Sequence, residues 1–261
     1  MIGMGFTLFV KRFRNSEGCR YIFLFLDKLT QAVFRKYLLT LLLILTVLPN
    51  GCRRSSGLPE MIDSYYLKYE IRYQEERAGD IPTRILPNTM EAYYTKYYVL
   101  TKIEGFFNQF SLIQISDLRR RRVSTLLNFF GNKVCYEGGY GELPAAIVEP
   151  DRLDCRFTGE NRIIGGLNSE RVEVDTGEEQ FSIYCTRDFS VRRPNISTPY
   201  RSVDYPLTDF RIQLSLLKMQ LTCTGLDKKC VESKIFSIPD EYREVDRESM
   251  ERIINSLFTK E

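Results

Sequence analysis

Short runs of β-branched and aromatic residues, separated by Gly, Pro, Asn and Asp, constrain the fold of this chain more than any other feature. In residues 65–73, apolar Leu67, Tyr69 and Ile71 alternate with charged side chains. Every second side chain of a strand lies on the same face, so this pattern is typical of a strand buried on one side. Similar runs follow at the spacing of antiparallel strands. The sequence therefore predicts a mainly β domain.

Two hairpins are predicted in the second half. In the first, residues 171–175 and 180–186 alternate around a turn at Thr176-Gly177. In the second, residues 212–221 form one arm with a bulge near Leu217, and residues 231–238 form the other. Residues 90–104 are ambiguous because their tyrosines also fit helical spacing, but the aromatic and β-branched content favours a strand.

The chain is predicted to end in a helix over residues 246–258. Asp246 is a suitable N-cap, and the apolar residues follow at i, i+3, i+4, i+7 and i+8. These residues are Met250, Ile253, Ile254, Leu257 and Phe258. Such a stripe usually packs on the domain's own sheet, so we expect a structural role for this helix.

An apolar run that ends at a cysteine indicates a bacterial lipoprotein export signal. A basic pair precedes the run from Tyr37 to Leu48, and Gly51 precedes Cys52. The run is shorter than the ~20 residues that cross a bilayer. We expect a lipid on Cys52, a tether over residues 53–60 and a single β domain over 61–261. An uncleaved signal anchor is the alternative, since Pro49 departs from the usual lipobox.

The first 34 residues do not resemble the short leader of such a signal. We interpret residues 1–52 as an over-extended N-terminus followed by the signal peptide, with the true start near Leu29 or Val33. A cytoplasmic N-terminal extension is the less favoured alternative.

Composition argues against several function classes. Residues 53–261 carry 30 basic and 32 acidic side chains, without the positive surplus of a nucleic-acid-binding domain. The chain has no histidine, so Ser-His and Cys-His catalysis and most zinc sites lack their imidazole. The acidic residues fall in no catalytic motif. We therefore expect no catalytic residues, metal or cofactor, and no enzymatic activity.

Five cysteines remain after Cys19 and Cys52 are set aside. They are Cys135, Cys155, Cys185, Cys223 and Cys230. Cys223 and Cys230 flank a turn-like stretch and could form a disulfide across a hairpin, or both could be unpaired.

The half from Arg162 onward resembles small Gram-negative envelope lipoproteins of the LolA-like, lipoprotein-carrier type. The matching segments are Ile164-Gly165-Gly166-Leu167, Tyr184-Cys185-Thr186-Arg187-Asp188, Pro199-Tyr200 and residues 236–242. The resemblance implies an open antiparallel β-barrel or curved sheet with a C-terminal helix. It supplies no catalytic residue.

Two functions fit these observations. The first is a module of the outer membrane, lipid-anchored and facing the periplasm, that holds a lipid or other hydrophobic ligand inside the barrel. Its candidate cavity residues are Val172, Val174, Ile183, Leu214, Leu216 and Met219. The second is an assembly subunit of an envelope protein complex with a filled core. The charge run Arg119–Arg122 could touch anionic lipids, but a solvated turn is favoured.

We predict that Cys52→Ala releases the protein from the membrane fraction or stops its processing. A single acyl chain binds membranes only reversibly, with K on the order of 10⁴ M⁻¹, and two or three anchor durably. Cell fractionation and intact-mass measurement test this. Unchanged mass and membrane association in the variant would contradict it.

Overall fold

The longest strand pair in the described part of the chain joins a strand near its start to one near its end. In the computed structural model, which describes residues 59–107 and 109–258, β1 (Met61–Tyr73) pairs antiparallel with β13 (Leu217–Glu232) along its whole length. The predicted alternation of β1 is confirmed, with Leu67, Tyr69 and Ile71 buried. Residues 58–261 form one compact unit. Cys52, the signal and most of the tether lie outside the described residues.

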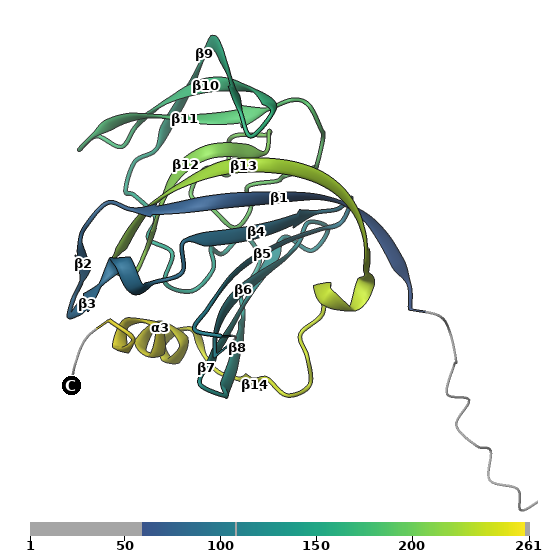
Figure 1. The fold of residues 1–261 in the computed structure, drawn as a ribbon, viewed down its shortest axis with the longest axis vertical. Helices are drawn as coiled ribbons and strands as arrows, with labels where there is room; N and C mark the ends of the chain where they lie inside the picture. Colours follow the sequence, from purple (N-terminus) through teal and green to yellow (C-terminus); the bar gives the residue numbers. More distant parts are fainter. Residues whose placement is uncertain (1–58, 108, 259–261) are drawn as a thin grey trace, which may run out of the picture. The chain divides into compact units, whose positions relative to one another are not determined.

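The described strands build one large curved sheet and a small ribbon (Figure 1). On one side of β1 lie β4 (Thr89–Tyr94), β5 (Tyr98–Gly105), β6 (Phe110–Asp117), β7 (Arg122–Phe129), β8 (Asn132–Glu137) and β14 (Arg243–Glu244). Beyond β13 lie β12 (Leu207–Leu214), β11 (Gln180–Thr186), β10 (Leu167–Asp175) and β9 (Asp154–Ile164). The ribbon pairs β2 (Arg77–Ala78) with β3 (Ile81–Pro82).

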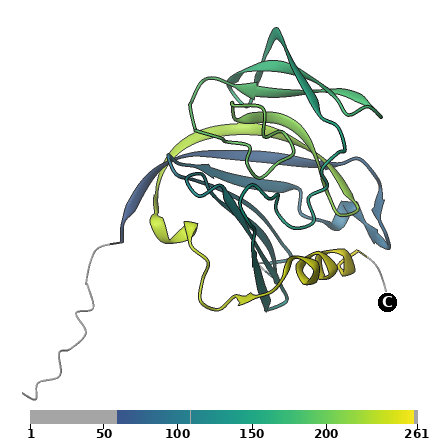
Figure 2. The same cartoon turned by 180° about the vertical axis from the view of Figure 1, so that it is seen from behind.

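This architecture confirms a mainly β fold with a C-terminal helix. All neighbours in the large sheet are antiparallel except β14 and β8. β9 and β14 lie at opposite ends of the strand order, so the sheet is curved and not closed into a barrel (Figures 1 and 2). The strand prediction for residues 90–104 is confirmed, although a turn at Thr95–Tyr97 divides the segment into β4 and β5.

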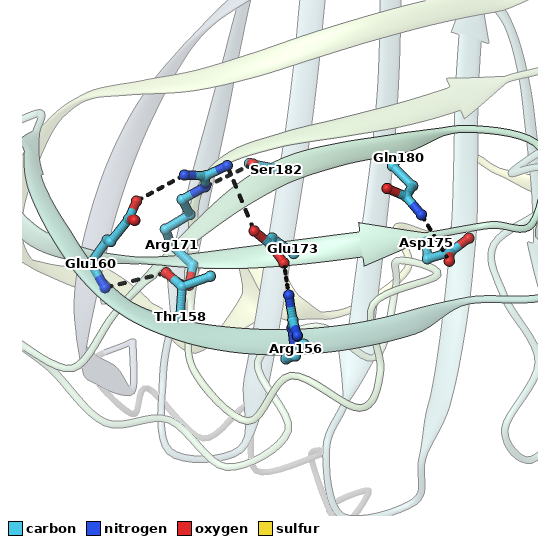
Figure 3. Close-up of polar contacts among 8 residues, drawn as sticks. All are labelled: Arg156, Thr158, Glu160, Arg171, Glu173, Asp175, Gln180 and Ser182. Atoms are coloured by element: carbon cyan, nitrogen blue, oxygen red, sulfur yellow. Dashed lines mark hydrogen bonds and ion pairs between the residues drawn. The ribbon is translucent and has the colours of Figure 1, made fainter.

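The first predicted hairpin is confirmed by the pairing of β10 with β11. Val172 faces Ile183 in the register and both are fully buried. The alternate residues carry a polar network on the other face, where Arg171 contacts Glu160 at 2.8 Å and donates to Ser182 Oγ at 2.9 Å (Figure 3). The two-residue period therefore separates core from solvent, as expected.

The prediction of the second hairpin is wrong about where the chain turns. Ser215 adopts a left-handed φ of 54°, and β12 and β13 meet there in a tight turn, with Leu214 opposite Leu217. The irregularity near Leu217 is this turn and not a bulge. Residues 217–232 then continue as one strand, because β1 offers a partner along that length.

The Cys223–Cys230 disulfide is therefore also wrong. Both cysteines lie on β13, where they pair with Tyr69 and Asp63 of β1, and both are free. Residues seven apart on one strand are separated by roughly 23 Å, far beyond the reach of a disulfide. The other described cysteines are free too.

Two long connections cover much of the concave face of the sheet. In the β8–β9 connection, Ala145 N–H donates to Thr125 Oγ1 of β7, and Ile147 bridges to Leu214 of β12. The β11–β12 connection buries Phe189, Ile196, Tyr200 and Val203 against the same core. Both connections are therefore part of the hydrophobic core.

The C-terminal segment passes around the edge of the sheet. The 3₁₀ turn Ser233–Phe236 packs on the outer face, where Phe236 stacks on Tyr98 at 5.3 Å between ring centroids. β14 then pairs with the edge strand β8, and α3 (Arg247–Ser256) follows beside the inner face. Because the C-terminal segment passes around the sheet edge at β14, it covers part of both faces of the sheet.

The predicted cap and stripe of the terminal helix are confirmed. The Asp246 side chain accepts a hydrogen bond from Ser249 N–H at 2.7 Å, which lowers the pKa of its carboxyl. Met250 and Ile254 are buried, and Glu251 accepts from Ala146 N–H at 3.4 Å. The helix packs on its own domain.

We predict that Ile254→Asp lowers the free energy of unfolding by about 3 kcal/mol or more, since Ile254 is 1% exposed and the new charge has no partner there. Chemical denaturation measures the change. Ser256→Asp adds the same charge at an exposed position of the helix and should cost less than about 1 kcal/mol. Equal effects of the two substitutions would contradict burial of the stripe.

Candidate functional site: an apolar cavity beside the terminal helix

An apolar cavity of about 190 Å³ lies between α3, the β2–β3 region and the concave face of the sheet. The last residues of β1 and β7 and the first of β6 and β13 contribute to its walls. Its lining residues are Tyr73, Ile81, Ile85, Leu86, Pro87, Ile103, Phe106, Phe110, Leu112, Leu127, Phe129, Phe130, Leu214, Leu217, Met219, Ile254, Leu257 and Phe258. Segments from both ends of the chain therefore build the cavity together.

The walls offer almost no polar chemistry. Tyr73 has the only polar side-chain group among the lining residues, and its hydroxyl donates to the Pro87 carbonyl at 2.5 Å. Burial raises the pKa of Tyr73, so its hydroxyl stays neutral. No charged side chain lines the cavity. Such a surface suits a neutral hydrocarbon or aromatic group.

Four phenylalanines lie at two neighbouring hairpin turns, and three of them, all except Phe107, line the cavity. Phe106 and Phe107 lie at the β5–β6 turn, and Phe129 and Phe130 at the β7–β8 turn. All four are exposed, Phe107 to 99%. Phe130 N–H donates to Gln109 O at 2.7 Å, which ties the two turns together. The cavity therefore opens toward solvent through an aromatic rim.

The backbone of this rim is strained. Phe106, Phe107 and Phe130 have φ values of 51°, 53° and 48°. Left-handed backbone is unfavourable for bulky side chains and easier for Gly or Asn. The chain thus places three phenylalanines where smaller residues would fit better, which points to a role for their exposed rings.

A second, smaller cavity of about 40 Å³ adjoins the first. The two share Ile103, Leu112, Leu214 and Met219, which therefore form a partition between them. The smaller cavity is more polar, since Thr101, Gln114, Ser197 and Thr198 contribute to its lining. Movement of the flexible Met219 side chain would connect the two spaces.

Only part of the predicted cavity lining lies in this site. Leu214 and Met219 line both cavities. Val172, Val174 and Ile183 are buried in the same core cluster but line neither cavity, and the β11–β12 connection contributes buried side chains to that cluster. Leu216 is wrong as a lining residue, since it lies in the β12–β13 turn and is 47% exposed.

Sequence reasoning missed the aromatic rim and the helix residues of the cavity. A usable signal was present, since Phe106-Phe107-Asn108 and Phe129-Phe130-Gly131 each place paired aromatics at a turn-forming residue. Exposed apolar side chains at a turn are more informative than buried ones. The helix stripe was identified, but only as packing surface.

The described part of the chain offers neither a group of metal ligands nor a membrane-spanning helix. Among residues 59–107 and 109–258, no group of three or more Cys, Asp or Glu side chains could hold a metal ion. Within the same residues, no helix is long and apolar enough to span a bilayer.

Comparison with known proteins gives no family. No protein-family model and no curated protein matches the chain. Two solved structures of PNGF-II, in space groups P21 and C2, are similar with a TM-score of 0.46 each, 12% and 13% identity, and 74% of this chain covered. The chain spans 33% and 32% of those proteins. Nothing is carried over from them, and the LolA-like resemblance stays a prediction.

We predict that Phe107→Asn leaves stability unchanged or raises it by up to about 1 kcal/mol, because Asn tolerates the left-handed backbone that strains Phe107. Leu127→Ala, at a buried wall of the cavity, should cost about 2–5 kcal/mol. Urea denaturation compares the two. A loss above about 1 kcal/mol for Phe107→Asn would show that its ring stabilises the fold.

Proposed function

We propose that this protein is a non-catalytic, lipid-anchored envelope protein that binds a small hydrophobic group in the cavity beside α3. The main support for this proposal is the cavity itself, which has eighteen lining residues, none of them charged, and opens to solvent. Apolar walls that are open to water are unfavourable, so an apolar occupant that covers them would be favoured by the hydrophobic effect.

The volume limits the ligand. Apolar cavities of roughly 150 Å³ can hold a benzene-sized molecule, while drug-sized ligands occupy roughly 300–1,000 Å³. A cavity of about 190 Å³ therefore suits the end of an acyl chain or one aromatic ring. The adjoining 40 Å³ would add room for one or two methylene groups. The rest of a longer ligand would extend past the aromatic rim.

The rim supports this function by its place at the opening. Exposed phenylalanines beside an apolar cavity provide a surface on which a hydrocarbon can pass from a membrane or a partner without contacting water. The four rings come from two turns that are hydrogen-bonded together, so they form one surface.

The anchor belongs to the same proposal. A lipid on Cys52 would hold the domain at the outer membrane, on the periplasmic side. The tether of residues 53–60 spans at most about 28 Å when extended. The domain would then stay within reach of the bilayer from which an acyl chain could come.

A subunit of an envelope assembly is the second candidate function. The observation in its favour is Phe107, whose ring is 99% exposed and does not line the apolar cavity. Exposed aromatic side chains are common anchors in protein interfaces. In this case a protein partner would cover the rim, and one of the partner's side chains would occupy the cavity.

A fluorescent fatty-acid probe tests the ligand-binding proposal. The probe should bind the wild-type domain (residues 58–261) and be displaced by unlabelled fatty acid. Leu214→Trp fills the partition region and should weaken binding by about tenfold or more, since a lost hydrophobic group is worth about 1.5–3 kcal/mol. Leu216→Trp is the matched control, because it adds the same ring at an exposed turn.

The outcomes separate the two candidate functions. Lipid found on the purified protein by native mass spectrometry supports ligand binding. Absence of both lipid and probe uptake would refute it, and a stable high-mass complex would then favour the assembly subunit. Equal binding by Leu214→Trp and Leu216→Trp would place the probe elsewhere on the molecule.

A further inference from the structure

A second hollow, of about 770 Å³, lies at the other end of the long strands. It is bounded by the start of β1, the β4–β5 and β6–β7 turns, the loop at Ser190–Arg192 and residues 228–230 of β13. Tyr65 lines this cleft and Tyr73 lines the apolar cavity. Tyr65 and Tyr73 lie eight positions apart on β1, so at most roughly 26 Å separates these two residues.

Positive charge dominates this cleft. Four exposed basic side chains contribute to its lining: Lys96, Arg119, Arg192 and Lys228. Asp63 is the only acidic residue of the lining. Lys229 also belongs to the lining, but its ammonium group lies 3.1 Å from the centroid of the Tyr66 ring, on the other face of the strand. The four basic side chains come from four separate segments, so the fold brings them together.

Within the described part of the chain, no carboxylate lies within ion-pairing distance of these four basic groups. Most of the other described arginines do have a carboxylate partner at that distance. The nearby Asp117 is already engaged. Its Oδ1 accepts the backbone N–H groups of Arg119 and Arg120, both at 2.9 Å. Like charges in one hollow repel each other, so an anion would relieve an unfavourable arrangement.

Aromatic contacts hold the basic groups in place. The Arg119 guanidinium lies 4.6 Å from the centroid of the Tyr97 ring, and Nη2 donates to Tyr98 Oη at 3.2 Å. Leu118 N–H donates to Tyr97 O at 2.9 Å, which joins the two turns. Lys228 lies 5.7 Å from the Tyr65 ring centroid. An arginine held in this way is preorganised to bind an oxyanion.

The floor of the cleft is polar and aromatic. Tyr94 and Thr95 are buried there, and Tyr65 is half-buried. The Tyr65 ring already packs on Phe189, with 4.6 Å between ring centroids, and the Tyr97 ring on the Arg119 guanidinium, so these tyrosines offer their hydroxyls to a ligand. The volume lies within the range of small-molecule sites, roughly 300–1,000 Å³. The cleft therefore combines basic groups for an anion with hydroxyl groups for hydrogen bonds.

We infer that this cleft binds a phosphate-bearing ligand built on a polyhydroxylated group, such as a phosphorylated sugar or the headgroup of a phospholipid. Arg119 and Lys228 bind the phosphate oxygens, with Lys96 and Arg192 contributing charge at the rim. The hydroxyls of Tyr65 and Tyr97 hydrogen-bond to the hydroxylated part. This binding does not depend on the occupant of the apolar cavity.

Calorimetric titration of the full chain in a nonionic detergent tests the inference. The probes are glucose 1-phosphate, inorganic phosphate, dihexanoyl phosphatidylglycerol and, as the neutral reference, glucose and dihexanoyl phosphatidylcholine. Binding of a phosphorylated probe should weaken by about tenfold in Arg119→Gln and in Lys228→Gln, and further with added salt. Lys68→Gln is the matched control, because Lys68 is exposed on β1 but lines neither site.

Glucose 1-phosphate binding without phosphatidylglycerol binding would identify a soluble ligand, and the reverse would identify a lipid headgroup. Either result supports the inference. No binding of any phosphorylated probe, or equal losses in Lys68→Gln and Arg119→Gln, would overturn it. Melting temperature and fatty-acid probe binding, measured on the same variants, show that the fold and the apolar cavity are unaffected, so failure here is distinguishable from failure of the proposed function.

Discussion

The pairing of β1 with β13 is the constraint on which the rest of the structure depends. β1 carries β4 to β8 on one side, and β13 carries β9 to β12 on the other. Most neighbours within each half of the sheet are consecutive strands of the chain, whereas the pair that joins the halves connects residues more than a hundred positions apart. Tyr69, fully buried in this pair, donates its hydroxyl to the Leu207 carbonyl at 2.8 Å. That hydrogen bond links β1 to β12, which lies beyond β13. Loss of the β1–β13 pairing would therefore separate the two halves of the sheet.

Both candidate sites follow from the same arrangement. The long pair sets the distance between the apolar cavity and the basic cleft, since β1 and β13 contribute residues to each. The passage of residues 233–246 around the β8 edge then brings α3 to the inner face, where it completes the cavity wall. Neither site is contained in one continuous segment of the chain.

Local features of this fold could be predicted from the sequence, and long-range ones could not. The alternation of β1, the β10–β11 hairpin and the Asp246-capped helix all rest on neighbouring residues, and the structure confirms them. The β12–β13 turn was misplaced because the stretch from Leu214 to Leu217 has no glycine or asparagine to mark it, and Ser215 adopts the left-handed conformation instead. Of the predicted cavity-lining residues, Leu214 and Met219 line the site, whereas Val172 and Ile183 are buried in the core outside it. The long β8–β9 and β11–β12 connections, which also belong to this core, could not be predicted because their sequences have neither strand nor helix periodicity.

The open edge at β9 has a consequence for how copies of the protein meet. A long unpaired strand is a template for another strand, and edge-to-edge addition is a common start of fibre growth. Here the edge carries charged side chains, including Arg156 and Glu160, and its register is broken where Gly159 adopts a φ of 77°. Charge and a local twist both disfavour a flat, continuous ladder with a second copy. Among the described strands, the long edge strand β9 therefore carries its own obstacles to pairing with a second copy of the chain.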